Sequence, residues 1–492
     1  MATLEEIRIA RLNKLQKLKE AGVDAYPAKT DRDFEIAKLI SEFENLQKEN
    51  TVVTIAGRVM ALRIQGAIGF ADIFDGTRLD TGQSGKFQIL LKKDENISGK
   101  DFDLFVETVD IGDFVEASGT LFVTKRSEKT LQVSKWKMLT KSLQPLPEKW
   151  AGLQDIEERY RKRYLDLLMN SELRDLIIKK SKFWDVTRTF FKDQGFLEVE
   201  TPVLETTTGG AEARPFKTHH NDFDLDMYLR ISVGELWQKR LMAAGFPKTF
   251  EIGKVYRNEG TSPEHLQEFT NMEFYWGYAD YKMGMALVKE LYQTIAKEIF
   301  GKTQFEYNGH KFDLAGDWAL IDYTEEIKKQ TGIDIDKATE NEMKTRLQEL
   351  KITYQGENKE RLVDTLWKCC RKNISGPAFL VNHPVLVAPL AKRIAEGQTV
   401  QMFQPIIAGS EVGRGYSELN DPIDQKERFE LQGRLMEAGD EEAMMPDLEF
   451  VEMLEHGMPP TCGFGFGERL FAILAGKPLR ELQTFPLMRP KE

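Results

Sequence analysis

Two alternating runs joined by a short polar loop, at residues 250–256 and 269–275, predict a β-hairpin near the middle of the chain. Arg257 follows the first run, and Glu259 lies two residues further on. In an extended strand, residues i and i+2 point to the same face, so these two side chains are expected to share one space. A guanidinium there can bind phosphate oxygens, and the carboxylate can accept from an amino group. The alternative interpretation is a solvated ion pair on a surface hairpin.

The composition is that of an ordinary globular protein with room for at least two domains. The chain has 492 residues, of which 41% are hydrophobic and 30% charged, and its formal net charge is −11. This charge argues against a surface that coats nucleic acid as a whole, although it is compatible with a local basic patch. No apolar run approaches membrane-spanning length, so no membrane partner is expected.

The three cysteines, Cys369, Cys370 and Cys462, show neither a zinc-binding spacing nor a disulfide framework. This pattern favours a reduced, cytoplasmic protein. The six histidines are scattered, so we expect any metal to be a hard cation held by carboxylates.

Changes of pattern divide the chain into a smaller N-terminal and a larger C-terminal part. Residues 1–50 are expected to form a helical extension. Five short alternating runs within 51–142 predict a small β-barrel of the oligonucleotide-binding (OB) type. A proline-stiffened linker covers 143–155. Residues 156–492 mix helices and strands and are expected to form one large α+β domain, with a helical insertion near 301–375.

Local signals place three elements within these parts. Helical periodicity covers 4–21, and a second helix over 172–194 ends before Gly195. The run 196–202 is a predicted strand that is closed by Pro202.

Four side chains of the predicted barrel are candidates for contacts with unpaired bases. Arg58, Arg63, Phe70 and Gln88 offer stacking and hydrogen bonds of the kind that single-stranded nucleic acid uses. The alternative is a structural barrel whose arginines are incidental.

Segments dense in glycine, arginine and glutamate recur through the large domain. They are 208–216, 234–240, the hairpin already described, and 411–420 together with 463–470. Taken alone, each has an ordinary explanation, such as a glycine-rich strand against which another backbone packs. Their order is more informative: a proline-closed strand, then Arg-x-Glu in a hairpin, then a glycine-rich strand that leads into Glu468 and Arg469.

In this order, the segments resemble the three signature motifs of class II aminoacyl-tRNA synthetases. A barrel before the catalytic domain is similar to the aspartyl, asparaginyl and lysyl subgroup. Four segments resemble the bacterial lysyl-tRNA synthetases: RYRKRYLDL at 159–167, GGAEARPF at 209–216, HHN at 219–221 and DLDMYLR at 224–230. The resemblance spans nearly the whole chain.

The resemblance implies a catalytic domain with a large antiparallel sheet flanked by helices, and an OB-fold that binds the anticodon. It also implies a homodimer that uses ATP with Mg²⁺, activates L-lysine to lysyl-adenylate and transfers lysine to the 3′ end of tRNA(Lys). Pro202 resembles the proline of the first motif at the dimer interface.

By the same resemblance, residues that handle ATP can be named. Arg257 resembles the arginine that bridges the substrate carboxylate and the α-phosphate, and Arg469 faces the nucleotide from the other side. The remaining positions similar to ATP contacts are Glu259, His265, Phe269 and Glu411. The chemistry needs no protein nucleophile, because the carboxylate of lysine itself attacks phosphorus.

The lysine site is expected to have two ends. Gly210 and Glu235 resemble the clamp on the α-amino group. Glu273 and Glu418 resemble the readers of the side-chain ammonium, with Tyr275 and Tyr416 as walls. Carboxylates suit a cationic substrate, and an acidic or neutral amino acid would leave their charge unpaired.

The chain departs from the family pattern at several positions. Arg414 stands where asparagine is usual, and Gln404 replaces a carboxylate that helps to hold Mg²⁺, which leaves Glu411 and Glu418 as the candidate metal ligands. The third motif is one residue shorter before Glu468, and the segment 232–235 is one residue longer. The added guanidinium at 414 and the lost carboxylate at 404 both make the local charge more positive, so we expect a lower requirement for Mg²⁺.

Two other functions remain open at this point. A related enzyme could attach lysine to an acceptor other than tRNA, but relatives of that kind tend to lack the barrel. A catalytically silent RNA-binding scaffold is the other, although it would have no need of Arg257, Glu259, Phe269 and Arg469.

Overall fold

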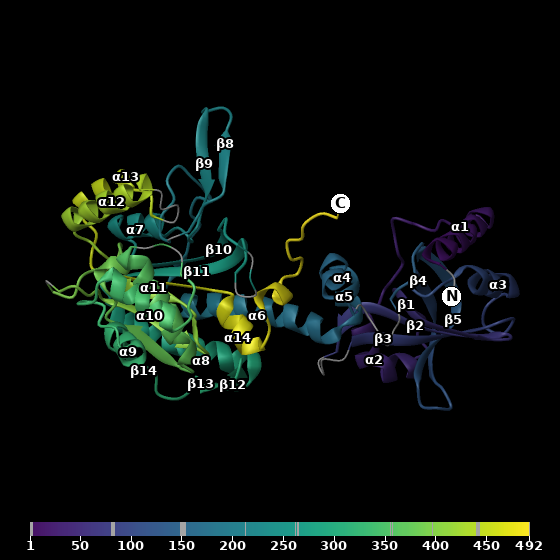
Figure 1. Ribbon diagram of the computed structural model, residues 1–492. Helices are drawn as coiled ribbons and strands as arrows, with labels where there is room; N and C mark the ends of the chain where they lie inside the picture. Colours follow the sequence, from purple (N-terminus) through teal and green to yellow (C-terminus); the bar gives the residue numbers. More distant parts are fainter. Residues whose placement is uncertain are drawn as a thin grey trace. The chain divides into compact units, whose positions relative to one another are not determined.

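The computed structural model describes residues 3–79, 84–147, 154–211, 213–260, 262, 265–354, 356, 358–395, 397–438 and 443–491. The chain divides into two compact units, Met1–Met169 and Asn170–Glu492 (Figure 1). Among the described residues, no helix combines the length and the apolar character needed to cross a membrane.

The first unit is built on a closed five-stranded barrel with the strand order β1-β2-β3-β5-β4. Its strands are β1 (Val53–Gln65), β2 (Ile68–Arg78), β3 (Ser84–Lys92), β4 (Phe114–Val123) and β5 (Lys129–Thr140). Alternate residues such as Ile55, Ile73, Ile89 and Val133 are fully buried inside it. The predicted barrel is therefore confirmed.

Among the residues of this unit that the structure describes, five helices accompany the barrel. They are α1 (Leu4–Glu20), α2 (Ile36–Lys48), α3 (Gly99–Thr108), α4 (Ile156–Arg161) and α5 (Arg163–Met169). Helix α1 begins with a capping box between Thr3 and Glu6, and α2 places Leu39 and Phe43 in the barrel core. Helix α3, between β3 and β4, is not among the sequence predictions.

The second unit contains a nine-stranded sheet. Its strands in order are β14 (Ala319–Asp322), β15 (Ala378–Val381), β16 (Met402–Ile407), β18 (Arg414–Ser417), β19 (Thr461–Gly467), β11 (Glu268–Gly277), β10 (Lys248–Tyr256) and β6 (Leu197–Glu198), and β17 (Ser410–Glu411) pairs with β16. The centre is antiparallel, whereas the β14–β15 and β6–β10 pairs at the two edges are parallel. The α+β class is thus confirmed. The strand expected over 196–202 pairs only at Leu197–Glu198.

The two faces of this sheet have different partners because side chains alternate along a strand. On one face, Phe274, Phe464 and Phe466 share a core with helices α6 (Ser171–Asp193), α8 (Tyr281–Phe300) and α14 (Arg469–Ala475). On the other face, Tyr275 packs with residues of α7 (Glu235–Ala243), α12 (Pro422–Glu437) and α13 (Leu448–Glu455). The polar residues of β11 therefore lie on the α7 side.

The segment 301–375 is less helical than expected. It contains the hairpin β12 (Gln304–Tyr307) and β13 (His310–Asp313), then β14, and only afterwards α9 (Tyr323–Thr331), α10 (Glu340–Glu349), α11 (Lys359–Cys370) and the 3₁₀ turn η1 (Arg371–Asn373). The expectation of helix is wrong over 304–322, because β14 forms by pairing in parallel with a strand more than fifty residues later.

The remaining elements are short. Strands β7 (Leu204–Glu205), β8 (Lys217–His220) and β9 (Leu225–Leu229) form a small sheet, and the β8–β9 hairpin projects from its unit (Figure 1). Two further 3₁₀ turns are η2 (Val385–Val387) and η3 (Leu479–Leu482).

Candidate active site

The alternating glycines of β19 make room for polar side chains on the α7 side of the sheet. Gly463 lies opposite Tyr275 and Gly465 opposite Glu273 in the β11–β19 pairing. A Cβ at Gly463 would overlap Glu418 Oε1, and a Cβ at Gly465 would lie 2.9 Å from Cγ of Glu273. The glycines are therefore required by close approach of these side chains.

Three carboxylates are buried in this space. Glu235, at the start of α7, is 5% exposed, Glu273 on β11 is 6% exposed, and Glu418, just after β18, is 1% exposed. Glu273 accepts hydrogen bonds from the backbone N–H of Val233 at 2.7 Å and from the hydroxyl of Tyr275 at 3.1 Å. Burial raises the pKa of Glu273 to about 7, and repulsion from Glu235 adds to this rise.

Lys239 joins two of these carboxylates. Its Nζ donates to Glu235 Oε1 at 2.7 Å and lies 2.5 Å from Glu418 Oε2. The hydroxyl of Tyr416 donates to the same oxygen of Glu235. Burial alone would lower the pKa of Lys239. Attraction to the two carboxylates outweighs burial, so the net pKa is raised and the ammonium form is favoured. Burial raises the pKa of Glu418, and the ammonium of Lys239 opposes that rise.

Gly210 closes one end of the cluster. Its φ of +86° is in the region that favours glycine, and a Cβ there would lie 2.7 Å from Glu235 Oε2. The backbone at Gly210 and the carboxylate of Glu235 therefore face each other at close range, as the prediction of a clamp at these two residues requires.

Arg257 lies just beyond the end of β10. Its Nε and Nη2 are each 3.3 Å from the carbonyl oxygen of Ile231, and its guanidinium carbon is 5.4 Å from the ring centre of Phe269. Burial lowers its pKa, while the charges of Glu259 and Glu273 oppose that change. Strand β10 ends at Tyr256, so Arg257 and Glu259 lie just beyond the extended run, and the charge of Glu259 acts on Arg257.

A second group of polar residues lies around Glu411. Arg469 Nη1 donates to the backbone oxygen of Glu411 at 3.1 Å, and Gln404 Nε2 donates to its carboxylate at 3.3 Å. The amide oxygen of Gln404, Oε1, lies 2.8 Å from His383 Nε2. Burial lowers the pKa of His383 to about 3, so this histidine is neutral near pH 7.

Comparison with known proteins agrees with this geometry. Residues 155–489 match the family described as tRNA synthetases class II (D, K and N), and residues 53–139 match the OB-fold nucleic acid binding domain. The chain belongs to the class II tRNA synthetases. It is similar to the lysine–tRNA ligases of Roseiflexus sp. (strain RS-1), with 43% identity over 99% of this chain and 100% of the relative, and of Thermotoga maritima, with 40% identity over 99% and 97%.

The carboxylates of this synthetase do not fit a resident Mg²⁺ held by Glu411 and Glu418. The two oxygens of Glu411 accept from Trp367 Nε1 at 2.6 Å and from Gln404, and Glu418 is ion-paired with Lys239. Across the described part of the chain, no three His, Cys, Asp or Glu side chains form a group that could hold a metal ion. The prediction of a metal at Glu418 therefore lacks support from the donor set.

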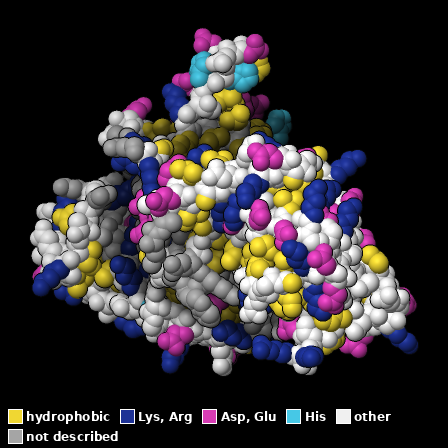
Figure 2. Space-filling view, turned by 90° about the vertical axis from the view of Figure 1, so that its right-hand side faces the viewer, with side chains coloured by type: hydrophobic (Ala, Val, Ile, Leu, Met, Phe, Trp, Pro, Cys, Tyr) yellow, Lys and Arg dark blue, Asp and Glu magenta, His cyan; other side chains and the backbone are white. Residues whose placement is uncertain are grey.

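The four barrel residues of the synthetase lie on β1, β2 and β3. Arg63 pairs with Phe70, and Asp72, two residues on, pairs with Gln88, so Arg63, Phe70 and Gln88 share the outward face. The side chain of Arg58, in contrast, packs against residues of the first unit: Nη1 donates to the backbone oxygen of Gly112 at 3.3 Å, and the guanidinium lies 4.3 Å from the Phe114 ring centre. On the face drawn in Figure 2, basic and acidic side chains are interspersed.

Other predicted residues are placed as follows. Pro202 is exposed, as are the apolar Val203 and Leu204 after it. His265 Nδ1 lies 2.8 Å from the hydroxyl of Ser262 in the loop of the hairpin.

Two buried residues of the site region have no place in the sequence prediction. Lys239 falls in a segment singled out for its carboxylate, and its position four residues after Glu235 is the signal that could have found it. Glu205 on β7 accepts from Trp237 Nε1 at 3.0 Å, and burial raises its pKa to about 7. No local pattern marks Glu205.

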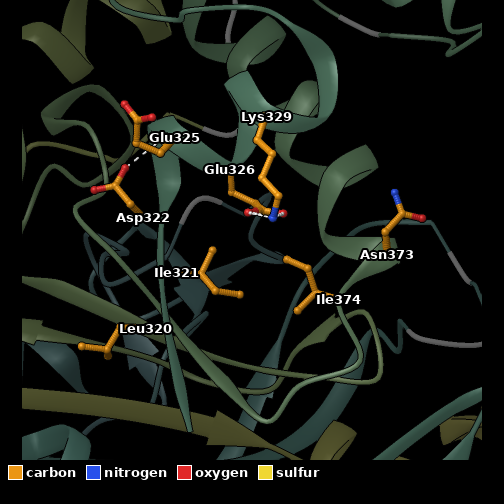
Figure 3. Close-up of a pocket in the computed structure, with 8 residues that line it drawn as sticks. All are labelled: Leu320, Ile321, Asp322, Glu325, Glu326, Lys329, Asn373 and Ile374. Atoms are coloured by element: carbon orange, nitrogen blue, oxygen red, sulfur yellow. Dashed lines mark hydrogen bonds and ion pairs between the residues drawn. The ribbon is translucent and has the colours of Figure 1, made fainter.

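The second unit also has an open cavity of about 530 Å³ next to α9. It is lined by Leu320, Ile321, Asp322, Glu325, Glu326, Lys329, Asn373 and Ile374 (Figure 3). Lys329 lies across it and is ion-paired with Glu326 at 3.0 Å. None of these residues is a predicted site residue.

Proposed function

We propose that this chain is an ATP-dependent ligase that activates L-lysine to lysyl-adenylate and transfers lysine to the 3′ end of tRNA(Lys). The observation that carries the proposal is the cluster of buried carboxylates of Glu235, Glu273 and Glu418, of which Glu273 lies on the same hairpin as Arg257 and acts on its charge. Carboxylates in a buried site favour a substrate with ammonium groups, and a neighbouring guanidinium suits its carboxylate and a phosphate.

In the first step, a carboxylate oxygen of lysine attacks the α-phosphorus of ATP. A bond forms between that oxygen and phosphorus, and the bond to pyrophosphate breaks. Arg257 and Arg469 would stabilise the developing negative charge, and Phe269 would stack on adenine while Glu259 accepts from its amino group. His265 and Glu411 complete the proposed ATP contacts.

In the second step, a terminal ribose hydroxyl of the tRNA attacks the acyl carbon, and AMP leaves. Gly210 and Glu235 would hold the α-amino group, while Glu273, Glu418, Tyr275 and Tyr416 would read the side chain. Positioning by these residues supplies the catalysis, with no protein nucleophile. Mg²⁺ is proposed to enter with the phosphates of ATP.

The other parts of the proposal concern partners and organisation. Arg63, Phe70 and Gln88, with a smaller share from Arg58, would contact the anticodon on the barrel of 51–142. The exposed apolar run at Pro202 would lie in a homodimer interface. Residues 1–50 would form an N-terminal extension and 143–155 the linker that follows the barrel. Residues 156–492 would form the catalytic domain, within which 301–375 is an insertion. The free cysteines suit the cytoplasm.

Two measurements test the proposal. Lysine-dependent exchange of pyrophosphate into ATP reports the first step, and charging of a lysine tRNA transcript reports the second. Exchange with another amino acid but none with lysine would overturn the substrate. Exchange without tRNA charging would favour an acceptor other than tRNA, and no exchange with any amino acid would favour a silent scaffold. Neither alternative has an observation in its favour.

A further inference from the structure

Lys239 is a buried ammonium that the proposed reaction leaves without a role. It is 1% exposed, and its Nζ lies 5.4 Å from the ring centre of Tyr416 and 5.9 Å from that of Tyr275. These are the two proposed walls of the lysine site. The protein therefore places a lysine side chain of its own beside the site that would read the side chain of free lysine.

The charges of the site give this residue a purpose. Three buried carboxylates, Glu235, Glu273 and Glu418, face a substrate that has only two ammonium groups. Among the residues that the structure describes, Lys239 is the only lysine or arginine ion-paired with any of the three. With all three carboxylates ionised, as two bound ammonium groups would favour, the cluster and Lys239 have a net charge of −2, which the substrate neutralises. Without Lys239 one buried carboxylate would have no counter-ion.

Lys239 is ion-paired with one of the two carboxylate oxygens of Glu418. Both oxygens of Glu418 are buried and accept no hydrogen bond of regular geometry from a described residue; Oε2 is ion-paired with Lys239 at 2.5 Å, which leaves Oε1 without a donor. Oε1 points to Gly463, where a Cβ would overlap it. A buried carboxylate oxygen with no donor is costly unless a ligand supplies one, so Oε1 is the available acceptor for an ammonium group.

We propose that Lys239 is a specificity-determining counter-ion, which neutralises the surplus carboxylate and ties Glu235 to Glu418 so that the pocket selects an amino acid with two ammonium groups. The proposal rests on the proposed function as a lysine-activating enzyme. Lys239 acts through Glu418: its positive charge favours the ionised form of that carboxylate, which the side-chain ammonium of the substrate requires.

The test uses the full-length chain and lysine-dependent pyrophosphate exchange. Lys239→Met keeps the length of the side chain and removes its charge. We expect the KM for lysine to rise roughly 30-fold, with less than a threefold change in kcat and in the KM for ATP, because the reader of the side chain loses its charge. Discrimination between lysine and the uncharged analogue norleucine should fall. Arg240→Met is the matched control: Arg240 is on the same helix as Lys239 but pairs with Asp447 at the start of α13, so its loss should leave all three values within threefold.

A second variant separates this role from mere packing. If Lys239 acts through Glu418, the double variant Lys239→Met with Glu418→Gln should have the same KM for lysine as Glu418→Gln alone. The double variant also lacks the unpaired charge, so it provides the measurement if Lys239→Met does not fold.

Three results would overturn the inference: a lower KM for lysine in Lys239→Met, which would make the ammonium a competitor of the substrate; an unchanged KM; or multiplicative effects in the double variant. If the unmodified chain shows no lysine-dependent exchange, the proposed function fails. If it does show exchange and the variants behave in one of these three ways, only the role of Lys239 fails.

Discussion

Lys180 on α6 donates to Glu468 Oε2 at 2.7 Å and so joins two residues that are 288 positions apart. Glu468 is the residue before α14, and its other oxygen accepts from the backbone N–H of Thr270 on β11 at 3.0 Å. Burial alone would raise the pKa of Glu468. The charge of Lys180 and the hydrogen bonds outweigh burial, so the net pKa is lowered. The carboxylate of Glu468, next to Arg469, thus connects helix α6 and strand β11 of the hairpin to the third motif.

Lys180→Met should lower the free energy of unfolding of the second unit by about 3 kcal/mol, since it leaves the buried carboxylate of Glu468 without its ammonium. Denaturant unfolding at pH 7 measures this change. A carboxylate whose pKa is lowered by folding stabilises above its unfolded pKa and loses that effect as pH falls, so the difference should shrink in acid. Lys182→Met, at an exposed contact on the same helix, is the control. Equal effects of the two variants would exclude the Glu468 ion pair as the cause.

Arg257→Lys should reduce kcat/KM for lysine-dependent pyrophosphate exchange by about 100-fold or more, because an ammonium cannot reproduce the planar fork that binds carboxylate and phosphate. The melting temperature, measured alongside, distinguishes this loss from unfolding. A decrease below threefold in a folded variant would remove Arg257 from the reaction.

Glu418→Gln should raise the KM for lysine roughly 30-fold and leave the KM for ATP nearly unchanged, since the side-chain ammonium loses an ionised partner. Steady-state exchange with each substrate varied in turn measures the two constants. Comparable increases in both would mean that Glu418 has no role in specificity.

Glu205 makes stability depend on pH in the opposite sense to Glu468. Burial raises its pKa from an ordinary 4.5 to about 7, so the unfolded chain releases this proton first as pH rises. Between those pKa values the free energy of unfolding should fall by about 3 kcal/mol, and Glu205→Gln should abolish that fall. Thermal unfolding between pH 5 and 8 tests this expectation, with the exposed Glu200→Gln as control. A pH profile that is unchanged in Glu205→Gln would contradict it.

The Mg²⁺ requirement should depend on Gln404 and Arg414. The amide of Gln404 donates to the carboxylate of Glu411, and the charge of Arg414 acts on the neighbouring Arg257. Gln404→Glu combined with Arg414→Asn should shift the midpoint of Mg²⁺ activation, because the change restores negative charge beside the phosphates of ATP. Pyrophosphate exchange titrated with Mg²⁺ at constant ATP measures that midpoint. If the double variant has the same midpoint as the unmodified chain, these two residues do not set the requirement.

Local sequence predicted several elements closely. The helix expected over 4–21 is α1, and the helix expected over 172–194 is α6, which is followed by Gly195 with a φ of +78°. In both cases the capping residues and the helical pattern lie in the helix or directly beside it, so neighbouring residues are sufficient to predict it. In contrast, β14 depends on a parallel partner at 378–381, and no local period shows that.

The active site divides in the same way. The sequence by itself determined the hairpin and the alternating glycines at 463–467, because period-2 spacing can be read along the chain. The order of the motifs carried the family resemblance, and that resemblance implied the candidate residues Glu235, Glu273 and Glu418. Only the tertiary structure decided that Lys239 lies between Glu235 and Glu418 and that Glu418 is therefore unsuited to a metal. The physical reason is that charge pairing in a buried site depends on distance in space, and these residues come from segments nearly 180 positions apart.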